Sequence, residues 1–214
     1  MDRRFPRRRL LLAAPAVLLA GCASSRNSPP PPTNQYQPPL APGQWSVLFS
    51  SQLVPAQIPL NGTLNFPGDG QGVHYLVTPM TVGLGQTVAL AFTIGGTGHM
   101  VDLSQPAGTP SVRLFLWRAG DNLTAVGPYQ QYRYWSVADA PDYGMATYSL
   151  SAKIDPALWT DVSAAPGSQF PSNFSACVAD SYGIGFTLGG YFAGHGQDVT
   201  GGTAWLTVDS FAVF

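Results

Sequence analysis

Hydrophobic and polar residues alternate along most of the chain from residue 44 onward, with a period of two. The clearest stretch is TVALAFTIGG at residues 87–96, where large apolar side chains occupy every second position. Successive side chains of a β-strand point to opposite faces of the sheet, so this pattern indicates a strand with one buried face. We expect about eight such strands, because the pattern recurs elsewhere. The other segments are 45–51, 73–79, 112–118, 131–137, 146–154, 184–190 and 203–214.

The region between residues 153 and 182 departs from this alternation. Asp155 is suited to cap a helix whose first residue is Pro156, which predicts a short helix at residues 156–163. A second short helix is expected at 172–179, where apolar residues recur at helical spacing. The fold class is therefore all-β, and we predict one antiparallel β-sandwich of the jelly-roll type with one or two short helices.

The closing third of the chain resembles the galactose-binding-like sandwiches, which include many carbohydrate-binding modules. The resemblance rests on the tryptophan of IDPALWTDV, the strand IGFTLGGYF and the final LTVDSFAVF. It implies a fold and, by analogy alone, a carbohydrate-binding function. It does not identify a specific family.

The N-terminus has the pattern of an export signal. Five arginines precede an apolar run from Leu10 to Ala20, which is too short to span a bilayer as a helix. The residues Leu19-Ala20-Gly21-Cys22 resemble the lipobox of bacterial lipoproteins. That resemblance implies cleavage before Cys22 and attachment of fatty acyl chains, such as palmitate, to this cysteine. An ordinary signal peptide that happens to contain a cysteine is the alternative.

These features divide the chain into three parts. Residues 1–21 form the signal peptide, residues 22–43 form a lipidated, proline-rich tether, and residues 44–214 form the β-sandwich domain. Ala23 follows the cysteine where an aspartate would favour retention in the inner membrane. The resemblance therefore implies a lipid anchor in the outer membrane, on either its periplasmic face or the cell surface.

Charge argues against nucleic-acid binding. After residue 27 the chain has three arginines and one lysine against ten aspartates, which leaves no basic face for phosphate groups. The partners that we expect are the membrane, through the anchor, and a glycan.

Several kinds of enzyme are excluded by missing residues. The chain contains no glutamate, which rules out the paired glutamates of concanavalin-like glycosidases and the arginine–glutamate–arginine strand of jelly-roll alginate lyases. Asp139 and Asp142 lie in VADAPDYG, which we interpret as a loop. We assign no catalytic residue, and an enzyme that acts on polysaccharides through two aspartates remains an alternative.

Metal and thiol chemistry have weak support in the sequence. His74, His99 and His195 show none of the local spacing typical of zinc ligands, and we place His74 on a strand and the other two in glycine-rich loops. A structural calcium ion at Asp198 or Asp209 remains open, although the sequence supplies few of the six to eight oxygens required. We expect Cys177 to be a buried, unreactive thiol. No cofactor is expected.

Aromatic and arginine residues on two adjacent strands form the candidate binding site. In VRLFLWR, alternation places Arg113, Phe115 and Trp117 on the face opposite the core. In the next strand, Arg133 and Trp135 share one face. Flat aromatic rings stack on sugar rings and arginine binds hydroxyl groups, so a glycan-binding face would leave these rings partly exposed. Alternatively, residues 155–180 cover this face and the rings form a second core layer. Trp45, Trp159 and Trp205 are expected to be packing residues.

Three functions fit these observations. The first is an outer-membrane lipoprotein whose β-sandwich binds carbohydrate without catalysis. The second is a structural or protein-interaction lipoprotein of the cell envelope. The third is a polysaccharide-active enzyme.

Overall fold

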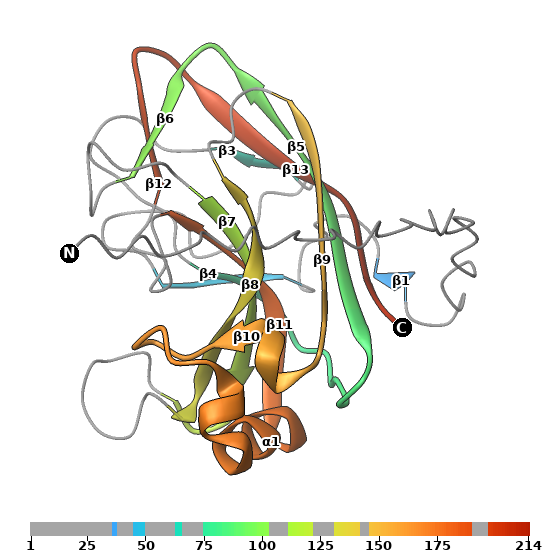
Figure 1. Ribbon diagram of the computed structural model, residues 1–214. Helices are drawn as coiled ribbons and strands as arrows, with labels where there is room; N and C mark the ends of the chain where they lie inside the picture. Colours follow the sequence, from blue (N-terminus) through green and yellow to red (C-terminus); the bar gives the residue numbers. More distant parts are fainter. Residues whose placement is uncertain are drawn as a thin grey trace, which may run out of the picture. The chain divides into compact units, whose positions relative to one another are not determined.

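The computed structural model describes residues 36–37, 45–49, 63–65, 75–102, 111–121, 131–141, 146–189 and 197–214. Cys22, His74, His195 and Asp142 lie outside these ranges. Within them the strands form a five-stranded sheet, a six-stranded sheet and a two-stranded sheet, all antiparallel. The two large sheets share one hydrophobic core. The predicted antiparallel β-sandwich is thus confirmed (Figure 1).

The five-stranded sheet has the order β1–β13–β5–β9, with β3 also paired to β13. Its long central strands correspond to segments in which alternation is strongest, and in Figure 1 β5, β9 and β13 lie side by side. The strands are β1 (Tyr36–Gln37), β3 (Thr63–Asn65), β5 (Thr87–Gly96), β9 (Thr147–Lys153) and β13 (Ala204–Val213).

The six-stranded sheet has the order β10–β8–β7–β11–β4–β2. The strands are β2 (Ser46–Phe49), β4 (Tyr75–Thr78), β7 (Ser111–Arg118), β8 (Arg133–Pro141), β10 (Trp159–Thr160) and β11 (Ser181–Gly189). β8 extends to Pro141, so the interpretation of VADAPDYG as a loop is wrong for residues 137–141, which include Asp139. The strand continues because Asp139 pairs with Arg113 of β7 across the sheet.

Two glycine-rich segments that we expected to be turns contain strands instead. β6 (His99–Asp102) and β12 (Gln197–Thr200) pair with each other, with Thr200 opposite His99. His99 therefore lies on a strand rather than in a loop, and the backbone of Asp198 also lies on a strand. Local glycine content predicted turns, but pairing between segments almost 100 residues apart overrides that tendency.

The core lies between the two large sheets. Val112, Leu114 and Leu116 of β7 are fully buried there, as their alternation predicted. Trp45 and Trp159 also belong to this core, which confirms them as packing residues. Trp205 is 37% exposed, so its assignment as a packing residue is wrong.

The segment between β9 and β11 contains the helical part of the fold. Pro156–Leu158 is a single 3-10 turn, so the expected helix at 156–163 is wrong in length; β10 begins at once and pairs with β8. The Asp155 carboxylate nevertheless accepts a hydrogen bond from the Ala157 amide, as its capping role predicted. A second 3-10 turn, Gly167–Gln169, precedes α1 (Pro171–Ala179).

The helix α1 confirms the second predicted helix. Phe174, Cys177 and Val178 project from it into the core, and Phe174 packs edge-on against Tyr134 of β8. None of the described helices is long and apolar enough to cross a membrane.

Candidate functional site

The five candidate residues lie together on the outward face of the six-stranded sheet. In the register of β7 and β8, Phe115 stands opposite Trp135 and Trp117 stands opposite Arg133. Arg113 stands opposite Asp139 on the same face. Alternation therefore identified the face correctly.

Most of this face is buried rather than exposed. Tyr75, Val77, Phe115, Trp117 and Trp135 form a second hydrophobic cluster, separate from the main core, which we call the outer aromatic cluster. Trp135 and Phe115 have no exposed surface, and Trp117 is 9% exposed. The expectation of partly exposed rings is therefore wrong. The alternative of a second core layer is confirmed for these rings, and Val162, from the 155–180 segment, packs against the cluster.

Two rings of this cluster meet across the strand that separates them. Tyr75 of β4 and Phe115 of β7 are separated by β11, yet their ring centroids are 4.7 Å apart and their planes nearly parallel. Strands two positions apart are separated by nearly 10 Å, so both rings must lean over β11. Gly185 of β11 stands opposite both Phe115 and Val77. A Cβ atom there would come within 1.9 Å of the Leu76 carbonyl oxygen, so this glycine allows the backbone of β4 to approach β11 closely.

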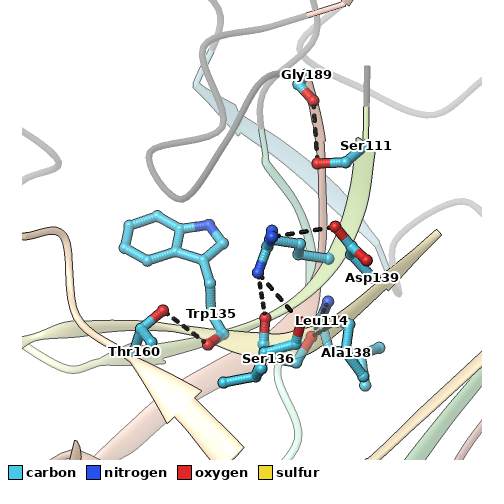
Figure 2. Close-up of polar contacts among 10 residues, drawn as sticks. Ser111, Leu114, Trp135, Ser136, Ala138, Asp139, Thr160 and Gly189 are labelled. Carbon is cyan, nitrogen blue, oxygen red and sulfur yellow. Dashed lines mark hydrogen bonds and ion pairs between the residues drawn. The ribbon is translucent and has the colours of Figure 1, made fainter. Parts of the chain in front are cut away.

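Arg113 is held by the neighbouring strand. Its guanidinium donates to the Ser136 carbonyl oxygen at 2.8 Å and pairs with the Asp139 carboxylate at 3.0 Å. Figure 2 shows the acceptors of these contacts, Ser136 and Asp139, and the dashed lines that reach them. No hydrogen-bond partner within the described residues reaches the buried Trp135 Nε1 atom. Arg113 thus connects β7 to β8 at the point where their pairing is irregular.

Arg133 and Trp117 are joined by a buried carboxylate. The Arg133 guanidinium donates to both oxygens of Asp121, with Nη2 at 2.7 Å from Oδ1, and Trp117 Nε1 donates to Oδ2 at 3.0 Å. The Arg133 and Asp121 side chains are only 6% and 2% exposed. Two parallel hydrogen bonds between a guanidinium and a carboxylate fix the orientation of both side chains. We call Trp117, Asp121 and Arg133 the buried clamp.

An exposed aromatic ring rests on the buried clamp. Tyr182 is 58% exposed, and its ring packs edge-on against Trp117 with centroids 4.8 Å apart. The pairing of β11 with β7 shifts by one residue between Ser181 and Gly183, so Tyr182 is the extra residue of a bulge. A bulge redirects a side chain, and this one directs Tyr182 outward over Trp117.

Charged groups flank the exposed tyrosine. Arg118, at the end of β7, donates two hydrogen bonds to the Asp180 carboxylate, which precedes β11. The Arg118 guanidinium also lies 5.1 Å from the centre of the Tyr132 ring. The end of the sheet at β7 and β11 thus combines one exposed ring with an arginine and an aspartate.

Burial keeps the Tyr75 phenol and the Cys177 thiol neutral. Burial raises the pKa of the Tyr75 phenol to about 12, with a smaller opposing effect of Arg133. Burial also raises the pKa of the Cys177 thiol well above its ordinary value, and this thiol has no exposed surface. Cys177 is therefore a buried, protonated thiol, as the sequence predicted.

The described residues contain no group of three or more histidine, cysteine or acidic side chains that could hold a metal ion. Asp209 accepts a hydrogen bond from Thr93. The calcium site therefore stays a hypothesis.

Sequence reasoning missed three residues of this region. Tyr182 was hidden because a bulge, rather than alternation, sets its direction. Asp121 lies in a turn, but the outward-facing Arg133 could have signalled the need for a nearby carboxylate. Tyr75 becomes part of the cluster through strand order, which local patterns do not reveal.

No family model, curated protein or solved structure matches this chain.

Proposed function

We propose that this protein is a lipoprotein anchored through Cys22 in the outer membrane and that its β-sandwich binds carbohydrate without catalysis. The observation that supports this proposal best is Tyr182, a ring that is more than half exposed yet packed against Trp117. This site replaces the buried rings of the outer aromatic cluster as the contact with sugar.

The buried clamp favours binding because it positions Tyr182 in advance. The ring rests on Trp117, whose indole is tied to Asp121, and Asp121 is tied in turn to Arg133. A ring that is already ordered loses little conformational entropy when a ligand arrives. Trp117 and Arg133 therefore act as positioning residues.

The neighbouring charges suit a ligand with many hydroxyl groups. The Asp180 side chain is 58% exposed and accepts hydrogen bonds, whereas Arg118 only donates them. A sugar that stacks on Tyr182 offers both donors and acceptors to such a pair.

The test is a binding titration of the full-length protein with soluble oligosaccharides. The variant Tyr182→Ala should weaken binding by about 1–3 kcal/mol, as loss of a stacking ring does elsewhere. Phe170→Ala is the matched control, because Phe170 is another exposed ring, 45% exposed, outside this site. Equal affinities for the wild type and Tyr182→Ala would refute this site.

The same titrations separate the other two functions. A structural or protein-interaction lipoprotein would bind none of the sugars, and an enzyme would release shortened products during incubation. The anchor is tested separately by mass spectrometry of the mature protein, in which acylated Cys22 should be the first residue. A product cut elsewhere would contradict the lipoprotein assignment.

A further inference from the structure

The outward face of β5, β9 and β13 in the five-stranded sheet differs from the outer aromatic cluster, because its side chains are mainly small and are exposed or half-buried. On β9 the side chains of Thr147, Ser149 and Ser151 all point outward and are exposed. On β5 the inward residues are large and apolar, whereas the outward ones are threonine, alanine and glycine. This part of the molecule is a broad sheet surface lined by hydroxyl and methyl groups.

Three threonines cross this face in one row. Thr147 of β9 stands opposite Thr93 of β5, and Thr93 stands opposite Thr207 of β13. Neighbouring strands are about 4.8 Å apart, so the row places one threonine at each such interval. This interval is close to the length of one sugar in an extended β-1,4-linked polysaccharide.

The hydroxyl groups of Thr147 and Thr93 donate their hydrogen bonds in a defined order. Thr93 donates to the Asp209 carboxylate at 2.7 Å and lies 2.9 Å from the Thr147 hydroxyl. A hydroxyl has one proton, so Thr147 is the donor to Thr93. The exposed Thr147 oxygen therefore keeps acceptor capacity toward solvent, where it can accept a hydrogen bond from a sugar hydroxyl.

A tryptophan ring lies beside the row. Trp205 precedes Thr207 by two residues on β13, so both side chains point outward. A Cβ atom on Gly95 would come within 2.0 Å of the Trp205 ring, which shows that the indole lies directly over this glycine. The side chain still keeps 37% of its surface exposed. The absence of a side chain at Gly95 thus lets an exposed ring lie against the sheet.

Charge on this face indicates the chemistry of its ligand. Among the described residues of β5, β9 and β13, two outward side chains are charged, Asp209 and Lys153. Lys153 stands opposite Thr87, at the end of β5 remote from Trp205. With one charge of each sign, the surface favours a neutral polymer over an acidic one.

We infer that this face binds an extended neutral polysaccharide, which crosses the strands along the threonine row and stacks one sugar on Trp205. The inference rests on the proposed carbohydrate-binding function and adds a second surface to it. Tyr182 binds sugars at the end of one sheet, and Trp205 holds a polymer on the face of the other.

The experiment measures retention of the full-length protein in detergent on insoluble cellulose and chitin, with soluble alginate, an acidic polymer, as competitor. Trp205→Ala should lower the affinity for the insoluble polymers about tenfold. Thr147→Lys, which places a long charged side chain on the row, should lower it as well. Trp205→Phe should retain most of the affinity, because a flat ring remains, and alginate should not displace the protein.

Soluble oligosaccharide binding through Tyr182 shows whether each variant is folded. Retention that survives Trp205→Ala, in a protein whose oligosaccharide binding depends on Tyr182, would overturn the inference and leave the proposed function intact. A wild-type protein that binds neither oligosaccharides nor polymers would overturn both. Retention that is lost in Trp205→Ala and preserved in Tyr182→Ala supports the second surface.

Discussion

Removal of the Asp121 carboxylate should destabilise the protein far more than removal of the equivalent carboxylate from a surface pair. Asp121 and Arg133 form an ion pair whose side chains are 2% and 6% exposed. The variant Asp121→Ala leaves the Arg133 guanidinium buried without this partner and takes away the acceptor of Trp117 Nε1. Breaking a buried pair in this way costs about 3–5 kcal/mol.

The matched control is the pair of Arg118 with Asp180. It has the same chemistry, and Arg118 follows Trp117 at the end of β7, but its side chains are 22% and 58% exposed. Water screens this pair, so Asp180→Ala should cost about 0–1 kcal/mol. The difference between the two variants isolates the effect of burial.

Urea unfolding at neutral pH measures both free energies of unfolding, provided that the dependence on urea is equal in all variants. A double variant, Asp121→Asn with Arg133→Met, should lose less stability than Asp121→Ala, because no charge is then left buried without a partner. Equal losses for Asp121→Ala and Asp180→Ala would refute the buried clamp, and with it the argument that Tyr182 is held in position.

Three further predictions follow from local geometry. Cys177 should not react with thiol reagents until the domain unfolds, which is measured by comparing labelling with and without urea. Ala164 has a φ of 63°, a conformation that glycine adopts more easily than alanine. Ala164→Gly should therefore raise the free energy of unfolding by a few tenths of a kcal/mol, up to about 1 kcal/mol. A lower melting temperature would contradict this. Trp117→Phe should lower the free energy of unfolding by about 1–3 kcal/mol more than Trp135→Phe does. Trp117→Phe removes a hydrogen bond to a carboxylate, whereas Trp135→Phe removes a buried donor that has no described partner. Urea unfolding of both variants checks the difference.

Alternation along the chain predicted the faces of the strands, except at the bulge that directs Tyr182 outward. It placed Leu114 in the core and Phe115 on the opposite face, and both assignments are correct. The reason is steric, because side chains in a strand point to alternate faces whatever the neighbouring strands are. The existence of the sandwich followed from the same regularity.

Alternation could not predict whether an outward face is covered. That depends on strand order, which brings Tyr75 to within stacking distance of Phe115 across Gly185. It also depends on the segment that supplies Val162 as a cover. These contacts join residues far apart in the chain, so no local pattern specifies them. The same limitation hid the pairing that places His99 on a strand.

The two outward faces differ in the number of aromatic rings that meet on them. On the six-stranded sheet, the rings of Tyr75, Phe115 and Trp135 pack together and exclude water, so they form a second core. Beside Gly95, a single ring, Trp205, lies over the backbone with no aromatic partner among the described residues of the facing strand, and it stays exposed. Rings that meet in a group bury one another, whereas an isolated ring keeps a surface that a ligand can contact. The isolated Trp205 is therefore a stronger candidate for contact with a ligand than the buried Phe115 and Trp135.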